Sequence, residues 1–223
     1  MFNDISANYD FLNHLLTFGI HSHWRNLLAK HIRLKENKNV LDLATGTGDV
    51  LLSLFRHNSG LQFGYGIDLA EKMLEIGRHK IQQNKLSEKI ILQTGNANAI
   101  PFADQTFDNV TMAFGIRNVE NPQLVLSEIH RVLIKDGIGL ILECSLPKNK
   151  LFRCLHLFYL RTIVPLVGAI FSGHRQAYRY LNKTIESFPY GDDFCQLMRQ
   201  AGFRNVNARP LLFGVATIYR GER

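Results

Sequence analysis

The residues with the clearest chemical potential lie in the stretch VLDLATGTGD, residues 40–49. Its apolar first half predicts a buried strand, and Gly46 and Gly48 predict a tight turn whose backbone can approach a ligand closely. A helix expected over 49–58 would point its first N–H groups at this turn. The stretch therefore predicts the first strand–turn–helix unit of a doubly wound sheet, with a polar or anionic ligand group at the turn. A tight turn without a ligand is the alternative.

The residues around the turn indicate which ligand it takes. A dinucleotide-binding turn has a third glycine or alanine, whereas this chain has Leu51 at that position. Asp42, near the end of the strand, would repel a pyrophosphate but would suit the ammonium group of a methionine-like ligand. The run from Asp42 through Thr45 to Gly48 reads D-x-A-x-G-x-G. This pattern is similar to the first motif of class I methyltransferases and indicates S-adenosylmethionine as the cofactor.

A second acidic residue, Asp68, follows an expected strand over 61–67. It lies 20 residues after Gly48, where a doubly wound fold places a carboxylate against a ribose. Asp68 is therefore predicted to accept hydrogen bonds from the ribose hydroxyls, although capping of the next helix is compatible with the same position. Met73, in that helix, is expected to belong to the core and to border the ribose.

Two polar loops follow later strands. In GNANAIPF, residues 95–102, Asn96 can accept from the adenine amine and the N–H of Ala97 can donate. Residues 115–118 read GIRN. Ligands of open α/β sheets lie outside the carboxyl ends of the strands, so we expect Arg117 and Asn118 to contact the methyl acceptor. A simple turn and a solvated arginine are the respective alternatives.

Composition restricts the class of protein. The 223 residues contain 26 Lys and Arg against 19 Asp and Glu, a net charge of +7. This excess favours an anionic membrane or a nucleic acid as partner. A basic surface that binds neither of them is an equal alternative. Three distant cysteines predict a reducing compartment and no zinc or other metal site. The first ten residues, MFNDISANYD, lack the apolar core of a signal peptide. We therefore expect a cytoplasmic protein.

Strand and helix patterns alternate through five units, which predicts an α/β fold with a mostly parallel sheet and right-handed crossovers. An antiparallel C-terminal hairpin is expected from two strands joined by a turn at Pro210. The expected strands are 40–43, 61–67, 90–94, 107–114, 138–143, 203–209 and 212–219, and the helices between them are 49–58, 71–83, 121–133 and 194–202.

The length predicts a single domain. We divide it into a helical N-terminal lid (1–34), a cofactor-binding core (35–145), a helical substrate lid (146–190), and the last helix and hairpin (191–223). The N-terminal lid is expected to contain helices over 4–16 and 21–34, with Tyr9 facing the site.

The substrate lid begins with a very apolar stretch, residues 151–171. A transmembrane helix is disfavoured because Arg153, His156 and Arg161 interrupt the stretch and because Pro165 and Gly168 are expected to break it. Two interpretations remain. It is a buried helix, or it is a lid that lines an apolar pocket and touches a membrane surface with its arginines.

Motifs along nearly the whole chain resemble those of one family. They are the opening at 1–13, FGIHSHWR at 18–25, VLDLATGTGD at 40–49, GIDLAEKML at 66–74, FDNVTMAFGIRNV at 107–119, YRYL at 178–181, FP at 188–189 and AGF at 201–203. Together they resemble the ubiquinone/menaquinone-biosynthesis C-methyltransferases of the UbiE/MenG type. The combination of AFGIRN with a preceding GTGD turn is the most family-specific feature.

The resemblance implies a Rossmann-like class I methyltransferase. Its reaction would move a methyl group from S-adenosylmethionine to a ring carbon of a polyprenylated quinol, with demethylmenaquinol the favoured acceptor. Asp68 would hold the ribose, and Tyr9, Arg117 and Asn118 would sit at the acceptor. The lipid tail implies peripheral contact with an anionic membrane at its inner face. We expect no nucleic acid partner, and a homodimer is left open.

The acceptor needs help to react. A quinol hydroxyl titrates near pKa 10, so deprotonating it at pH 7 costs roughly 4 kcal/mol. We hypothesise that Arg117 stabilises the quinolate and that Asn118 and Tyr9 position the ring or a water that takes the proton. His21 and His174 are weaker candidates for the base.

The sequence also departs from the family pattern. Asn96 stands where the family usually has aspartate, and Cys144 where it has phenylalanine. His156–Leu157 replaces Tyr-Asp, and Lys183 replaces glutamate. These departures concern the substrate pocket more than the cofactor.

Three rival functions are weighed against this assignment. A class I methyltransferase acting on RNA or another small molecule would share the cofactor turn. A scaffold subunit of a quinone-biosynthesis complex would keep the fold without turnover. A nicotinamide dehydrogenase is disfavoured by Leu51 and by Asp42 beside the turn.

Overall fold

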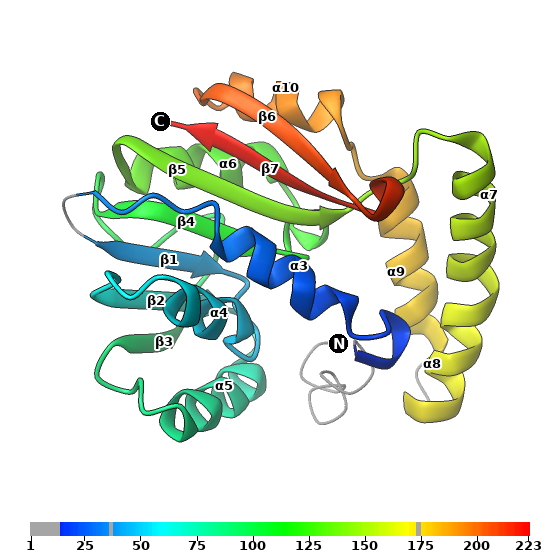
Figure 1. Ribbon diagram of the computed structural model, residues 1–223, viewed down its shortest axis with the longest axis horizontal. Helices are drawn as coiled ribbons and strands as arrows, with labels where there is room; N and C mark the ends of the chain where they lie inside the picture. Colours follow the sequence, from blue (N-terminus) through cyan, green and yellow to red (C-terminus); the bar gives the residue numbers. More distant parts are fainter. Residues whose placement is uncertain (1–13, 36–37, 173–174) are drawn as a thin grey trace.

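The computed structural model describes residues 14–35, 38–172 and 175–223. Its centre is a seven-stranded sheet of order β3-β2-β1-β4-β5-β7-β6 (Figure 1). Strands β1 to β5 run parallel, and β7 pairs antiparallel with both β5 and β6. The strands are β1 (Asn39–Leu43), β2 (Phe63–Asp68), β3 (Ile90–Thr94), β4 (Phe107–Ala113), β5 (Leu133–Cys144), β6 (Arg204–Leu211) and β7 (Ala216–Glu222). The predicted parallel sheet with an antiparallel C-terminal hairpin is confirmed.

Strand β1 lies at the point where the strand order reverses. Its next strand in sequence, β2, lies on one side, and β4 lies on the other. The carboxyl ends of β1 and β4 are adjacent because Leu43 is in register with Met112. A crevice at such a switch point is where open α/β sheets bind ligands.

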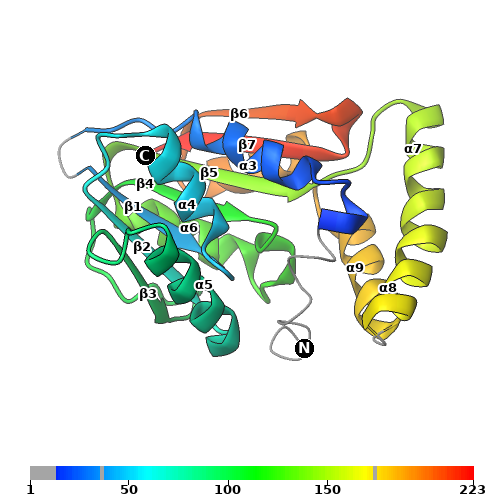
Figure 2. The ribbon, with the colours of Figure 1, turned by 60° about the horizontal axis from the view of Figure 1, so that its bottom comes forward.

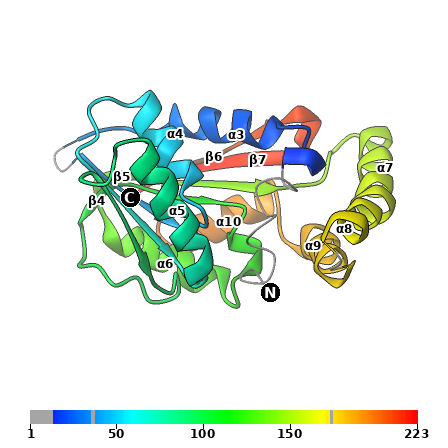
Figure 3. The ribbon, with the colours of Figure 1, turned by 90° about the horizontal axis from the view of Figure 1, so that it is seen from below.

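Helices cover both faces of the sheet (Figure 3). Helices α3, α4 and α5 contribute Leu28, Leu54 and Leu74 to one buried cluster. Helices α6 and α10 contribute Ile129 and Phe194 to the other. Apolar residues at helical spacing form these inner faces, as the sequence predicts. The helices are α3 (Ile20–Ala29), α4 (Asp49–His57), α5 (Glu71–Gln83), α6 (Pro122–Val132) and α10 (Asp192–Gln200).

A separate helical group stands beyond the end to which the parallel strands point (Figures 1 and 2). It contains α7 (Lys150–Phe158), a π-helical turn η3 (Tyr159–Ile163), α8 (Val164–Ser172) and α9 (Arg175–Ser187). The expectation that Pro165 and Gly168 break the helix is wrong. The π turn ends two residues before Pro165, and α8 continues from Val164 through Pro165 and Gly168; a wider turn of this kind is a usual place for a helix to accommodate an irregularity.

By length and composition alone, the helix over Lys150–Gly168 could cross a membrane, with 22% of its most apolar window buried. Leu160 and Val164 face inward, whereas Leu155 and Phe158 are exposed. The helix is therefore two-sided, with one face on the protein.

Helix α3 begins where the sequence predicts but ends earlier. The break at Phe18–Gly19 is confirmed, since Gly19 has φ 74° and is the N-cap residue that precedes α3. The following helix, however, ends at Ala29 rather than near residue 34. The backbone N–H of Arg33 donates to Asn109 Oδ1, and that of Lys35 donates to Asp108 Oδ1. These side chains at the start of β4 hold the chain extended, which local periodicity could not reveal.

The predicted turn at Pro210 is also misplaced. Pro210 lies inside β6, in register with Thr217, and the turn is made by Leu212–Gly214. Proline is tolerated here because β6 is the edge strand. The fifth strand is also longer than the expected 138–143, because β5 already begins at Leu133 and contains a distortion in which Asp136 has φ 57°.

Candidate active site

The glycine-rich turn after β1 is braced by Asp68. Gly46 and Gly48 have φ values of 55° and 76°, in the left-handed region that favours glycine. Asp68 Oδ2 accepts from the N–H of Gly46 at 2.8 Å, and Oδ1 accepts from the N–H of Ala70 at 2.9 Å. The carboxylate thus organises the turn and precedes α5. Its oxygens have further lone pairs for ribose hydroxyls. The alternative in which Asp68 caps α5 is wrong, because the N-cap residue is Ala70 and the N–H from which Asp68 Oδ1 accepts is that of Ala70, which precedes the helix.

Asp42 is fully buried in β1. Its Oδ1 accepts from Thr111 Oγ1 at 2.6 Å, while Oδ2 finds no hydrogen-bond partner among the described residues. Burial raises the pKa of this carboxyl to about 7, and the hydrogen bond from Thr111 opposes that rise. The buried hydroxyl of Thr45 lies close enough to this carboxyl to lower its pKa, but it makes no hydrogen bond of good geometry with the described residues. Orphaned polar atoms beside the turn fit a polar, cationic ligand group such as the methionine end of S-adenosylmethionine.

The residues predicted to surround the nucleoside also lie near this turn. Met73 is 2% exposed, and its Cε lies 3.5 Å from where a Cβ on Gly46 would stand. The loop after β3 reaches Asp68, because the N–H of Gly95 donates to the carbonyl of Asp68 at 3.1 Å. Asn96 is exposed, and its Oδ1 already accepts from Asn98.

A cavity of about 340 Å³ adjoins the turn. Most of its walls are apolar, and they come from the segment before α3, the ends of β1, β4 and β5, and the helical group α7 to α9. Residues lining it include Leu16, Phe18, Ile20, His21, Trp24, Thr45, Gly46, Thr47, Phe114, Arg117, Cys144, His156, Tyr159, Leu160, Val164, Leu181 and Ile185. An apolar cavity next to a polar cofactor turn can hold a hydrophobic acceptor.

The predicted acceptor residues have different positions. Arg117 lines the cavity. Asn118 is next to Arg117 on the 3-10 turn Ile116–Asn118 but is not among the residues that line the cavity, and its amide donates to the carbonyl of Phe114 at 3.4 Å. Tyr9 and His174 lie outside the described residues. Ala97, which was predicted to contact the adenine and not the acceptor, is partly buried against the second core cluster.

Arg117 carries an unforeseen partner. Its Nη1 donates to Glu143 Oε1 at 2.6 Å and to the carbonyl of Phe114 at 2.7 Å. The two charged side chains are 9% and 1% exposed. Glu143 was not a predicted site residue, although the glutamate at the end of an apolar strand pattern is a signal that could have indicated it.

The backbone at the strand ends is strained. Ala44, after β1, and Phe114, after β4, have φ values of 50° and 57°, which non-glycine residues adopt at a cost. A Cβ on Gly115 would lie 2.7 Å from the Cβ of Ala44, so the two loops touch only because residue 115 is glycine. Both strained residues line the cavity.

Three other polar residues on the cavity wall differ in their hydrogen bonds and in the direction of their pKa shifts. His21 Nδ1 lies 2.5 Å from Thr17 Oγ1. Burial raises the pKa of Cys144 to about 12, which keeps it a thiol. Burial lowers the pKa of His156, which keeps it neutral. Over 14–35, 38–172 and 175–223, His, Cys, Asp and Glu side chains do not gather in threes as metal ligands.

Comparison with known sequences identifies the family. The ubiE/COQ5 methyltransferase family matches residues 1–223. The chain belongs to the ubiE/COQ5 methyltransferase family. It is 44% identical to the ubiquinone/menaquinone biosynthesis C-methyltransferase UbiE of Geobacter sulfurreducens, over all of this chain and 87% of that protein. It is 38% identical to the demethylmenaquinone methyltransferase of Porphyromonas gingivalis, over 99% of this chain and 90% of that protein.

Solved structures agree on the architecture of this methyltransferase. A methyltransferase dependent on S-adenosylmethionine from Thermotoga maritima superposes with a TM-score of 0.65 at 19% identity, covering 100% of this chain and 99% of the other. One from Aquifex aeolicus gives a TM-score of 0.61 at 19% identity, covering 89% and 88%. At these identities the likeness concerns the fold, which is that of class I methyltransferases. The cofactor is S-adenosylmethionine, as the turn predicts.

Proposed function

We propose that this methyltransferase methylates a ring carbon of a polyprenylated quinol, with demethylmenaquinol as the acceptor. Family membership makes it a methyltransferase of quinone biosynthesis that uses S-adenosylmethionine. The observation that carries the acceptor class is the apolar cavity beside the cofactor turn. A naphthoquinol ring with a lipid tail needs such a wall, whereas RNA would need an open basic surface.

When bound, S-adenosylmethionine supplies an electrophilic methyl group. We assign Gly46, Gly48 and Thr45 to its methionine end, with Asp42 meeting the ammonium group. Asp68 would hold the ribose with Met73 at its edge. In the loop after β3, Asn96 and Ala97 would meet the adenine. The support for this arrangement is the convergence of these residues on one edge of the sheet.

We assign the acceptor to the cavity walls. The ring lies between the turn and α7, where apolar residues exclude water. Arg117 faces this space but shares its charge with Glu143, so its field at the ring is weaker than that of an isolated cation. We therefore assign Arg117 and Asn118 to orientation of the ring oxygens, with Tyr9 closing the site. We further propose that 1–34 and 146–190 act as lids over the core.

A methyl-transfer assay tests the acceptor. The protein is incubated with labelled S-adenosylmethionine and chemically reduced demethylmenaquinone, and a parallel tube holds a 6-methoxy polyprenyl benzoquinol. We expect label in the naphthoquinol product. Label only in the second tube would move the acceptor to the ubiquinone branch. Cofactor binding without label in either tube would support another acceptor or the scaffold alternative.

We also propose that α7 and the hairpin tip rest on the inner face of an anionic membrane. Leu151, Leu155 and Phe158 are 67%, 57% and 61% exposed. At the hairpin tip, Phe213 is 69% exposed and stacks on Phe152 with ring centroids 4.4 Å apart. Exposed apolar residues on a helix bearing arginines suit the interface of a bilayer, and the cavity behind them would receive the quinol from the lipid.

Vesicle sedimentation distinguishes this surface from ordinary exposed apolar residues. Phe158→Ser should reduce binding to vesicles containing anionic lipid. The control is Phe63→Ser, since Phe63 is 41% exposed at the start of β2, far from α7 (Figure 1). Equal loss in both variants, or none in either, would contradict the assignment.

Light scattering on the same preparations decides whether the protein is a homodimer.

A further inference from the structure

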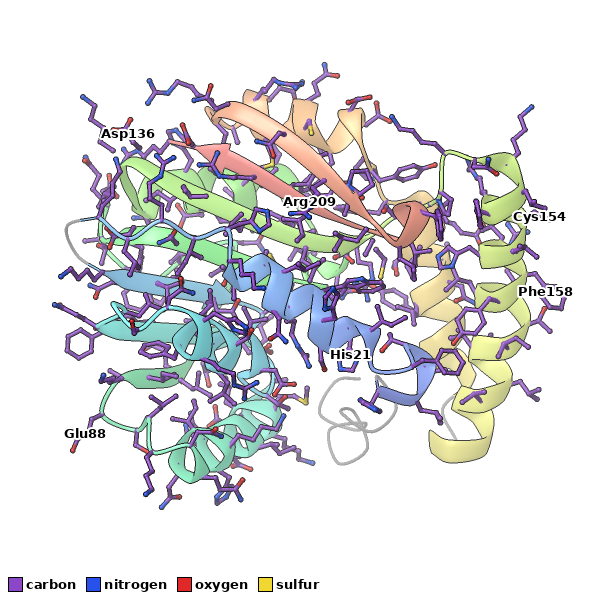
Figure 4. The ribbon with its side chains drawn as sticks, in the orientation of Figure 1. His21, Glu88, Asp136, Cys154, Phe158 and Arg209 are labelled. Carbon is purple, nitrogen blue, oxygen red and sulfur yellow. The ribbon has the colours of Figure 1, made fainter. Side chains whose placement is uncertain are left out.

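His156 lies in the last turn of α7, on the side of the helix that faces the cavity. Cys154 and Phe158 on the same helix point away from the body of the protein (Figure 4). His156 is two residues from each, a rotation of about 200° around a helix of 3.6 residues per turn. The helix therefore turns its histidine inward while its neighbours face outward.

The ring of His156 has an uncommitted nitrogen. Its Nε2 atom is buried and has no hydrogen-bond partner within the described chain. Buried polar atoms are rarely left unsatisfied, so this nitrogen calls for a partner that the cavity receives. Desolvation by burial lowers the pKa of the imidazole. The ring is thus neutral near pH 7 and can accept a proton.

The other titratable groups on the cavity wall are less suited to this task. Arg117 is a cation paired with Glu143. Tyr159 donates its hydroxyl to the carbonyl of Leu16 at 2.5 Å, and burial raises its pKa. The remaining titratable groups are Cys144, whose pKa burial raises, His21, whose ring is engaged with Thr17, and Arg25 and Asp49, which pair with each other.

We propose that His156 is the catalytic base that accepts the hydroxyl proton of the quinol through Nε2. The O–H bond breaks, its electron pair stays on the quinol oxygen, and the imidazole becomes an imidazolium. The ring carbon then forms its bond to the methyl group as the sulfur–methyl bond breaks, with that electron pair remaining on sulfur. The ring proton at the methylated carbon moves to the oxygen and restores the quinol. The imidazolium releases its proton to solvent, which balances the reaction.

This inference rests on the proposed function, and the test separates the two. The variants are His156→Gln, which keeps a polar nitrogen but cannot take a proton, and His156→Ala, which leaves room for imidazole. General-base catalysis contributes about 10²–10⁴-fold, so kcat should fall by that range in both. The dissociation constant of S-adenosylmethionine, measured by calorimetry, should be unchanged. The matched control is His130→Gln, because burial also lowers the pKa of His130 but that residue packs on Phe203.

The pH profile and chemical rescue give readouts that a structural role would not move. In the unmodified protein, kcat should rise with pH through a group titrating below the ordinary histidine range, and NMR of the His156 ring should report the same pKa. His156→Gln should lose that limb, and added imidazole should restore part of the activity of His156→Ala. An unchanged kcat and pH limb in His156→Gln, or absence of rescue, would overturn the assignment. If the unmodified protein binds cofactor but does not methylate the quinol, it is the proposed function that fails.

Discussion

Arg117 and Glu143 form a buried ion pair that joins the carboxyl ends of β4 and β5. The guanidinium Nη1 lies 2.6 Å from Glu143 Oε1, and the same oxygen accepts from the N–H of Cys144 at 2.8 Å. The pair forms part of the cavity wall through Arg117. Its first consequence is structural, because a buried charge that loses its partner is strongly unfavourable.

Arg117→Ala should therefore lower stability as well as turnover. Removing one member of a buried pair costs about 3–5 kcal/mol, which urea unfolding would measure. The double variant Arg117→Leu/Glu143→Leu removes both charges and should be less destabilised than Arg117→Ala. Turnover is then compared at a temperature where all variants are folded. Full turnover in Arg117→Ala with cofactor still bound would remove Arg117 from the acceptor site.

Asp68 should affect cofactor binding both directly and through the glycine-rich turn that it holds. Asp68→Asn replaces one acceptor oxygen by an amide that cannot accept from Gly46 or Ala70. Hydrogen bonds to charged groups are worth about 1.5–3 kcal/mol, so the dissociation constant of S-adenosylmethionine should rise on the order of ten- to a hundredfold. Calorimetry measures this, with Asp104→Asn as the control, since Asp104 is an exposed carboxylate paired with Arg131. Comparable affinities in the two variants would leave Asp68 with a structural role only.

Gly77 lies where helix α5 packs against the glycine-rich turn. A Cβ at this position would lie 2.6 Å from Leu92 Cδ1 and 3.1 Å from the backbone carbon of Thr47. Because Thr47 belongs to the glycine-rich turn, Gly77→Ala should push the helix from the turn and weaken cofactor binding. Gly60→Ala is the control, since its Cβ would meet only the end of the Leu34 side chain. Binding that is equally strong in both variants would show that the turn adapts.

The sequence predicted the elements that depend on local pattern. Helix α5 and strand β3 have the bounds expected from apolar periodicity. The glycines and Asp68 were found because a cofactor turn needs those residue types at that spacing. The fold class followed from the alternation of strands and helices.

What the sequence did not predict depends on contacts between distant residues. Glu143 was missed because its partner, Arg117, is 26 positions away. The end of α3 was misplaced because Asp108 and Asn109 hold the following segment. Pro210 was taken as a turn because proline cannot donate to a ladder, but at an edge strand that loss has no consequence.

The buried carboxyl of Asp42 should make both stability and cofactor affinity depend on pH. Its carboxyl has a pKa of about 7 in the folded protein against 3.8 for the ordinary group. Between these values the unfolded chain loses the proton and the folded chain keeps it, so this residue makes the free energy of unfolding fall as pH rises from about 4 to 7. Asp42→Asn should remove that contribution and be relatively more stable at high pH. Conversely, the affinity of the unmodified protein for S-adenosylmethionine should rise through pH 7, because the ligand ammonium attracts the ionised carboxylate. Urea unfolding and calorimetry at several pH values measure both effects. Parallel pH curves for the two proteins would show that Asp42 keeps an ordinary pKa and does not meet the ammonium group.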